Sequence, residues 1–333
     1  MRFIIYGAGG VGGTIGARLF ESRQDVVLIC RGAHLDAIRD GGLLLRTPEG
    51  ETKLPVPAVG HPRDIAFRWG DVVILAMKTQ DTEAALRELE AAAGTDIPVI
   101  CAQNGVENER LASRRFRNVY AMLVALPATF LVPGEVIASA TPLSGALHAG
   151  RYPNGVDATI TEVCAALSNA RFLAVPEARP MTLKYRKLLM NLSNGLDVIS
   201  GRASWGAGGE TGAAAEKLRD EGLACYAAAG IEATPLPEYV DRVQKHYSAK
   251  PVGGEARGAS STLQSVLRGH TVVEVDYLNG EIELLGKLHG VPTPYNTVVR
   301  RLAVEMAAKG EQPGSKTLED VVRLAGEEGS RKG

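Results

Sequence analysis

Short apolar runs alternate with longer segments of helical period along the first half of the chain. The runs are continuous blocks rich in Val and Ile, and they span Arg2–Tyr6, Val26–Cys30, Val72–Ala76, Pro98–Cys101 and Val119–Val124. Continuous apolar strands are typical of a parallel sheet that helices cover on both faces. The pattern therefore predicts an α/β fold with a doubly wound sheet in the N-terminal half.

The pattern changes after the fifth run. From Phe130 to about Tyr152 the chain is rich in Pro, Gly and small residues, which predicts loops and a short antiparallel extension of the sheet. After Val175–Pro180 the strand-like runs nearly vanish. Apolar residues then recur at three- and four-residue spacing, as at Leu278, Ile282 and Leu285, which is typical of helices that face a core. We therefore expect an all-helical C-terminal domain.

These patterns divide the chain into three predicted parts. We expect a sheet domain over residues 1–178, a helical domain for substrate binding or dimerisation over residues 179–325, and a frayed polar tail over residues 326–333. Gly253–Ser261 interrupts the helical pattern and is too long for a tight turn, so it is either a disordered link or a functional loop.

Composition narrows the class of protein. A length of 333 residues suits two domains, and 37 Lys+Arg against 38 Asp+Glu leave no overall field that would favour nucleic acid or an anionic membrane. The four cysteines are far apart and form no metal-binding pattern with histidine. No export signal precedes the first apolar run, and no run is long enough to span a bilayer. We expect a reduced, cytoplasmic chain without a bound metal.

A glycine motif lies between the first strand-like run and the first helix. The motif GxGxxG is matched by Gly7, Ala8, Gly9, Gly10, Val11 and Gly12. In that setting Gly7 allows a tight turn, Gly9 lets the backbone approach a pyrophosphate, and Gly12 lets the helix pack close to the strand. The helix N-terminus would attract the phosphates. The motif predicts a Rossmann-type dinucleotide site, and the alternative is a glycine-rich turn that binds no ligand.

The end of the second strand bears on the choice of dinucleotide. NAD-dependent enzymes place an acidic side chain there, on the ribose 2′-hydroxyl, whereas this strand ends in Arg31. An arginine can bind a 2′-phosphate with two hydrogen bonds. Arg31 therefore predicts NADP(H) as the cofactor, and the alternative is a solvated surface arginine.

Polar side chains also occur at regular intervals within an apolar helical segment of the second half of the chain. Lys187, Asn191 and Asn194 are spaced by four and three residues, which predicts one face of one helix. If this face lines a cavity, Lys187 could donate a proton to a carbonyl oxygen and Asn191 could hold a substrate oxygen. The alternative is an amphipathic helix whose polar stripe faces water.

Two further residues remain ambiguous from their surroundings alone. Asn104 follows the fourth strand, at the sheet edge where ligands bind in open α/β folds, but Asn-Gly is also a common turn. Glu274 is expected to open a long helix, where a carboxylate can be favoured by the helix dipole alone.

Taken together, these motifs resemble the ketopantoate (2-dehydropantoate) reductase family, whose members reduce a branched 2-oxo acid with NADPH. The resemblance spans nearly the whole chain. It rests on Gly7–Gly12, Arg31, Leu75–Lys78, Gln103–Gly105, Tyr185–Lys187 with Asn191, Ser260–Gln264 and Glu274–Gly280. It implies reduction of 2-dehydropantoate to pantoate, a step of pantothenate biosynthesis.

The resemblance also implies roles for individual residues. Lys187 would be the proton donor, Asn104 would lie between nicotinamide and substrate, and Asn191 would contact the substrate. Ser261 would also contact the substrate. The cofactor side would include Lys78, Ala128 and Glu274.

Departures from the family pattern concern the substrate side. A second asparagine expected one helical turn beyond Asn191 is Gly195 here, with Asn194 beside it as a possible substitute, and a later one is replaced within Gly206–Glu210. The alternatives that stay open are a reductase of another 2-oxo acid, an opine-type reductase, and a non-catalytic NADP(H) sensor. A homodimer is also possible.

Overall fold

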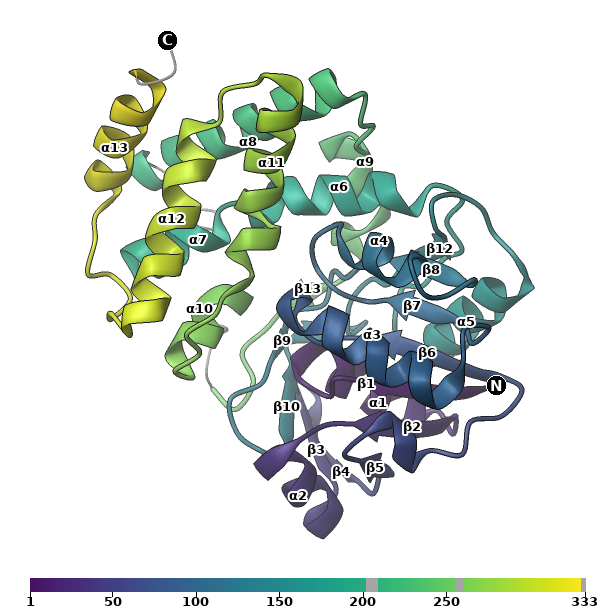
Figure 1. Cartoon of the computed structure of the whole chain (residues 1–333). Coiled ribbons are helices and arrows are strands. Elements are labelled where there is room, and N and C mark those ends of the chain that lie inside the picture. The colour runs from purple at the N-terminus through teal and green to yellow at the C-terminus, as the bar shows by residue number, and fades with distance from the viewer. Residues whose placement is uncertain (202–208, 255–259, 331–333) are drawn as a thin grey trace. The chain divides into compact units, whose positions relative to one another are not determined.

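The computed structural model of the chain describes residues 1–201, 209–254 and 260–330 (Figure 1). The chain divides into two compact units. The first unit comprises Met1–Lys184 with Thr234–Arg257, and the second comprises Tyr185–Ala233 with Gly258–Gly333. The first unit thus includes a segment, Thr234–Arg257, that the sequence pattern assigned to the helical domain.

A seven-stranded sheet lies at the centre of the first unit. Its order is β12-β8-β7-β6-β1-β2-β5, and neighbouring strands are parallel except for the edge strand β12, which is antiparallel to β8. The strands are β1 (Arg2–Tyr6), β2 (Asp25–Ile29), β5 (Ala58–Val59), β6 (Asp71–Leu75), β7 (Val99–Cys101), β8 (Val119–Met122) and β12 (Ala149–Arg151). The predicted α/β sheet and its short antiparallel extension are confirmed.

Helices cover both faces of this sheet. They are α1 (Gly10–Glu21), α2 (Gly32–Gly41), α3 (Thr79–Ala93), α4 (Asn108–Ser113) and α5 (Ala158–Asn169), with a 3₁₀ turn η1 (Pro62–Asp64). In β1, Phe3 and Ile5 belong to one core together with Ile15 of α1, whereas Ile4 belongs to a second core together with Leu86 of α3. Because both faces are buried, the strands are apolar throughout and not alternating.

A second, four-stranded sheet in the order β4-β3-β10-β9 was not predicted. Its strands are β3 (Leu43–Thr47), β4 (Gly50–Leu54), β9 (Ala128–Thr129) and β10 (Glu135–Ala138). Leu43 and Leu45 of β3 are buried, with the intervening Leu44 less so, which makes a half-buried strand. Three consecutive leucines hide this alternation in the sequence, and β9 and β10 are too short to produce a periodic pattern.

The segment Thr234–Arg257 joins the first unit through a strand pair. It contains α9 (Leu236–Arg242), the 3₁₀ turn η2 (Gln244–His246) and β13 (Ser248–Ala249), which is antiparallel to β11 (Ala140–Thr141). His148 adds a hydrogen bond of 3.1 Å between its Nε2 and the Arg242 carbonyl. Two-residue strands leave almost no trace in the sequence, so this return could not be predicted.

The second unit is helical over its described residues, as expected. Helix α6 (Pro180–Asn191) belongs to this unit from Tyr185 onward. The other elements are α7 (Asn194–Ser200), α8 (Gly209–Ala229), α10 (Ser261–Leu267), α11 (Asn279–His289), α12 (Pro294–Lys309), α13 (Leu318–Ser330) and the 3₁₀ turn η3 (Glu274–Tyr277). None of the described helices is long and apolar enough to span a membrane.

The first five residues of the predicted frayed tail, 326–330, belong to a helix. Helix α13 continues through Ser330, and residues 331–333 lie outside the described residues. Val321 and Ala325 are buried one turn apart, and Arg323 pairs with Glu327 at 3.0 Å. Apolar anchoring together with an i,i+4 ion pair stabilises the helix end despite its polar composition. Of the stretch Gly253–Ser261, residues 255–259 also lie outside the described residues.

Candidate active site

Four residues predicted to bind cofactor or substrate follow neighbouring strands of the large sheet. Gly7 follows β1, Arg31 follows β2, Lys78 follows β6 and Asn104 follows β7. Because these strands are parallel and adjacent, their carboxyl ends lie at one edge of the sheet. This is the edge at which open α/β folds bind ligands.

The glycine loop has a geometry that only glycine allows at two positions. Gly7 has a φ of +97°, and a Cβ atom there would lie 2.7 Å from the backbone nitrogen of Met77. A Cβ atom at Gly12 would lie 2.0 Å from the carbonyl oxygen of Gly7. At Gly9, by contrast, the nearest atom is 3.9 Å away, on the ring of Phe130. Packing therefore requires glycine at positions 7 and 12, whereas Gly9 leaves open space beside the backbone.

The N-terminus of α1 opens directly from this loop. Gly9 is the N-cap and has no side chain that could cap the helix, and the Gly13 N–H donates the first helical bond to the Gly9 carbonyl at 2.6 Å. The N–H groups of the first turn and the helix dipole favour a bound anion at this end. Open backbone at Gly9 beside an uncapped helix N-terminus suits the pyrophosphate of a dinucleotide.

A histidine that the sequence analysis did not identify anchors this loop. The Gly134 N–H donates to His34 Nδ1 at 2.9 Å, so the proton of the neutral ring is assigned to Nε2, which donates to the Ala8 carbonyl at 2.8 Å. The backbone of Ala128 and Thr129 also lies close to the loop, since a Cβ atom at Gly10 would lie 3.4 to 3.5 Å from it. His34 thus links Ala8 to the chain that follows β9.

The neutral state of His34 makes stability depend on pH. Burial lowers the pKa of His34 below its ordinary value of 6.5, and burial does the same for His148. Above the ordinary pKa the contribution of a neutral histidine to stability is complete. As the pH falls below it the unfolded chain takes up protons that the folded chain resists, so stability is lost.

We therefore expect the free energy of unfolding to fall between about pH 7 and pH 5. Urea denaturation across this range measures it. The free energy of unfolding of His34→Gln should fall less steeply over the same pH range, because the variant has lost one of the two buried histidines. An identical slope in both proteins would contradict a contribution from His34.

Arg31 is exposed but has a partner that the sequence did not reveal. It is the N-cap of α2, its side chain is 63% exposed, and its Nη2 lies 2.8 Å from Oε2 of Glu88 on α3. Burial opposes the charge on Arg31 and is the largest single effect, but Glu88 and Tyr6 together outweigh it and raise the pKa of Arg31. The guanidinium thus reaches solvent while it is held by a carboxylate.

A buried ion pair lies beside the peptide of Asn104. Lys184 and Glu109 are 3% and 0% exposed and form a salt bridge. Lys184 Nζ also donates to the Gln103 carbonyl at 3.0 Å, and Asn108 Nδ2 donates to the Asn104 carbonyl at 3.3 Å. The backbone on both sides of the Asn104 nitrogen is therefore held by buried groups. The sequence signal that could have identified this ion pair is the lysine at position 184, which lies on a buried face of α6.

Breaking this ion pair is expected to be costly. Glu109→Gln leaves the Lys184 ammonium buried without a countercharge, so we expect the free energy of unfolding to fall by about 3–5 kcal/mol. Denaturation in urea measures the loss. Glu107→Gln is the matched control, since Glu107 pairs with Arg110 at 3.5 Å nearer the surface and should contribute less than about 1 kcal/mol. Equal effects of the two variants would contradict this account.

In the second unit, Lys187 and Asn191 lie on α6, as predicted, but Asn194 does not. Helix α6 ends at Asn191, and α7 begins at Asn194 after a turn. Asn279 Nδ2 donates to the Leu192 carbonyl at 3.0 Å and so satisfies an acceptor that the continuing helix would have used. The prediction of one helical face for all three residues is wrong because this distant asparagine stabilises the break.

Gly195 has no room for a side chain. A Cβ atom there would lie 2.5 Å from Val299 Cγ1 of α12, and 3.4 Å from Asn279 Oδ1. An asparagine at this position would require α12 to move. The departure from the family pattern at position 195 is thus built into the packing of the second unit.

Glu274 begins a shorter element than expected, and Ser261 begins a short helix. Glu274 is buried at the start of η3, a 3₁₀ turn that ends at Tyr277, and the long helix α11 begins only at Asn279. The expectation that Glu274 opens a long helix is wrong, since the backbone at Leu278 leaves the helical region. Ser261 is the first residue of α10, and its side chain lies outside the described residues, as do residues 206–208.

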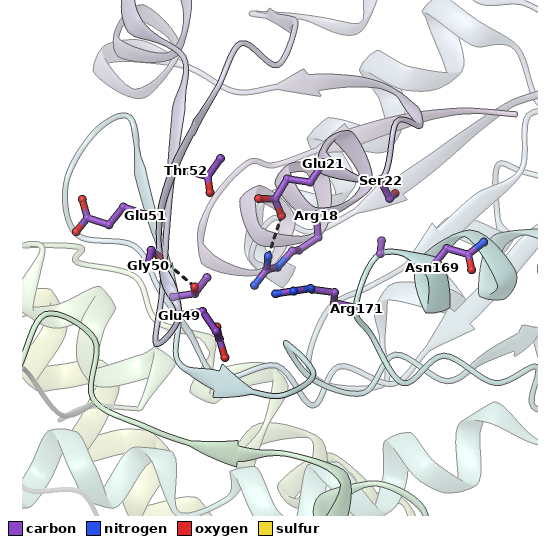
Figure 2. A pocket seen from close by; sticks show the side chains of 11 residues that line it. Arg18, Glu21, Ser22, Glu49, Gly50, Glu51, Thr52, Asn169 and Arg171 are labelled. Carbon is purple, nitrogen blue, oxygen red and sulfur yellow. Dashed lines mark hydrogen bonds and ion pairs between the residues drawn. The ribbon is translucent and has the colours of Figure 1, made fainter.

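A polar pocket of about 470 Å³ lies elsewhere in the first unit, beside the C-terminal end of α1 and therefore at the other end of this helix from the glycine loop. Arg18 and Arg171 point into it, as Figure 2 shows. Arg18 already pairs with Glu21 at 2.8 Å and donates to Ser144 Oγ at 2.9 Å. Because Glu49 and Glu51 also line the pocket, its charges largely cancel and favour no particular ligand.

Two family models match the chain. The model described as "Ketopantoate reductase PanE/ApbA" matches residues 3–154, and that described as "Ketopantoate reductase PanE/ApbA C terminal" matches residues 180–307. A curated relative, 2-dehydropantoate 2-reductase from Mesorhizobium japonicum, is 28% identical over 92% of this chain and 98% of its own.

Solved structures agree in fold over almost the full length. A PanE/ApbA family ketopantoate reductase from Ralstonia eutropha has a TM-score of 0.78 and 25% identity, and the match covers 94% of this chain and 100% of that one. D-mandelate dehydrogenase, solved with NADH and anilino(oxo)acetate, has a TM-score of 0.80 and 24% identity, and the match covers 93% of this chain and 99% of that one. One fold therefore occurs in proteins named for different 2-oxo acid chemistry.

Proposed function

Since this chain belongs to the ketopantoate reductase PanE/ApbA family of oxidoreductases, we propose that it reduces a small branched 2-oxo acid to the 2-hydroxy acid with NADPH. The first candidate substrate is 2-dehydropantoate, with pantoate as the product. The observation that carries the proposal is the common sheet edge at which the glycine loop, Lys78 and Asn104 lie in the first unit.

The glycine loop supports a nicotinamide dinucleotide as the cofactor. Open backbone at Gly9 and the uncapped start of α1 suit its pyrophosphate. Lys78 and the backbone of Ala128 would lie on the cofactor side, and Arg31 would bind the 2′-phosphate that distinguishes NADPH. When bound, the cofactor would supply the hydride.

The residues of the chain would supply the proton and hold the substrate. Lys187 would donate a proton to the carbonyl oxygen as the carbonyl carbon is reduced, so that the C=O group becomes CH–OH. Asn104 and Asn191 would donate hydrogen bonds to substrate oxygens. The buried pair Lys184–Glu109 would keep the peptide of Asn104 in place. Ser261 and Glu274 stay predicted members of this site.

A second candidate substrate is a 2-oxo acid with an apolar side chain. Gly195 offers no amide to the substrate, and Val299 packs against its backbone. A missing amide in a substrate pocket can change the preference between substrates by orders of magnitude. The fold itself does not distinguish between the two candidate substrates, since D-mandelate dehydrogenase shares it. Reduction of an imine to an opine-type product stays a further alternative.

A substrate panel distinguishes these candidates. Purified protein and NADPH would be assayed with 2-dehydropantoate, 2-oxoisovalerate and phenylglyoxylate, and NADPH absorbance followed. We expect kcat/KM for 2-dehydropantoate to exceed the others by about tenfold or more, which is the lower end of the discrimination that one extra substrate contact gives. A larger value for phenylglyoxylate would favour the second candidate. The homodimer also stays a prediction, which light scattering of the purified chain tests.

A further inference from the structure

A carboxylate lies next to the arginine at the end of β2. Oε2 of Glu88 accepts a hydrogen bond from Arg31 Nη2 at 2.8 Å and another from the Tyr6 hydroxyl, and it lies 3.6 Å from Nε2 of His61. All four residues belong to the first unit. Glu88 lies 57 residues beyond Arg31 in the sequence, so the two are adjacent only in the folded chain.

This arrangement combines two recognition groups that dinucleotide-binding folds ordinarily use as alternatives. An arginine near the end of the second strand accommodates the 2′-phosphate of NADP, whereas a carboxylate there accepts a hydrogen bond from the 2′-hydroxyl of NAD. Here the arginine follows the strand, and the carboxylate reaches it from α3. The same small volume thus holds a group suited to each cofactor.

We propose that Glu88 is a specificity-determining residue that reduces the preference of this chain for NADPH over NADH. The inference rests on the proposed function, because it presumes a nicotinamide dinucleotide in the glycine loop with its 2′-position near Arg31. A 2′-phosphate would have to share or displace the Glu88 carboxylate from Arg31, and its negative charge is repelled by that carboxylate. A 2′-hydroxyl meets neither cost and can donate to Glu88.

Glu88 is held where it can exert this effect. Tyr6 is 4% exposed, and burial, reinforced by Glu88, raises the pKa of its hydroxyl, so Tyr6 remains a hydrogen-bond donor to the carboxylate. The side chain of Glu88 is itself 31% exposed, which leaves it in contact with solvent and with an approaching ligand. Fixed by a buried donor on one side and open on the other, the carboxylate resists turning away from Arg31.

The Glu88 carboxylate is half-buried and reaches solvent, so its repulsion of a 2′-phosphate is weakened by screening from water and salt. The repulsion between a carboxylate and a phosphate about 4 Å apart corresponds to about a fivefold to tenfold change in affinity at low ionic strength. We therefore expect the wild-type chain to prefer NADPH over NADH by less than about tenfold. Removing the charge of Glu88 should raise that ratio about fivefold to tenfold, and added salt should shrink the difference between variant and wild type.

The experiment measures binding, with no substrate present. Dissociation constants for NADPH, NADH, 2′,5′-ADP and 5′-AMP would be determined by calorimetry for wild type, Glu88→Gln and the control Glu83→Gln. Glu83 lies on the same helix and pairs with Arg87 at 3.0 Å and Arg115 at 2.7 Å, away from Arg31. Glu88→Gln should bind NADPH and 2′,5′-ADP more tightly relative to NADH and 5′-AMP, and Glu83→Gln should match wild type.

Several results would overturn the inference. An unchanged ratio in Glu88→Gln, or the same change in Glu83→Gln, would exclude a specific role for Glu88. Tyr6→Phe, which removes the donor that fixes the carboxylate, provides a second variant and should change the ratio in the same direction by a smaller factor. If wild type binds no dinucleotide at all, the proposed function itself fails, whereas binding with an unchanged ratio contradicts only the role of Glu88.

Discussion

Replacing Lys187 with alanine is expected to lower kcat for the best 2-oxo acid substrate by about 10²- to 10⁴-fold, the usual contribution of a positioned proton donor. The affinity for NADPH should stay within about twofold, since the predicted role concerns only the carbonyl oxygen of the substrate. Steady-state kinetics with NADPH titrations before and after the substitution measure both quantities.

Lys217→Ala serves as the control for this variant. Lys217 is an exposed lysine on α8 of the same unit and should leave kcat unchanged. If Lys187→Ala keeps the wild-type kcat, the proposed proton donor is wrong. If wild type binds NADPH but reduces none of the acids tested, a non-catalytic NADP(H) sensor becomes the better interpretation.

Replacing Gly9 with alanine should strongly weaken dinucleotide binding while the fold is retained. The backbone of Gly9 has a φ of −69°, which alanine adopts readily, and an added Cβ atom would meet no atom closer than 3.9 Å. That methyl group would occupy the space through which a pyrophosphate approaches the helix N-terminus. We expect the dissociation constant for NADPH to rise by about 100-fold or more. This is the factor by which a misplacement of about 1 Å can slow an enzymatic reaction.

Gly12→Ala provides the contrast. Its Cβ atom would lie 2.0 Å from the Gly7 carbonyl oxygen and 2.8 Å from Ala76 Cβ, so α1 would have to move away from β1. We expect this variant to lose about 3 kcal/mol or more of stability through overpacking. Thermal denaturation and NADPH titration of both variants separate the two effects. A destabilised Gly9→Ala, or a Gly9→Ala that binds NADPH normally, would contradict the role given to Gly9.

The accuracy of the sequence prediction follows the range of the interactions involved. Five strands of the large sheet, β1, β2, β6, β7 and β8, were predictable because each is a continuous apolar run, and the sheet is buried on both faces, as Phe3 and Ile4 illustrate. Elements that depend on distant partners were not. β13 is two residues long and exists as the partner of β11, and the break before Asn194 depends on Asn279.

The sequence by itself determined the glycine loop, the parallel sheet and the helical second half, because local spacing and burial periodicity specify them. Arg31, Lys78 and Asn104 follow predicted strands in the sequence, but their position at one edge of the sheet depends on the strand order, which only the tertiary structure decided. Only the tertiary structure decided that Arg31 meets Glu88, that Lys184 meets Glu109 and that His34 holds Ala8. Such polar contacts join residues 26 to 75 positions apart, and since a charged or polar residue can pair with any complementary group, no local pattern specifies its partner.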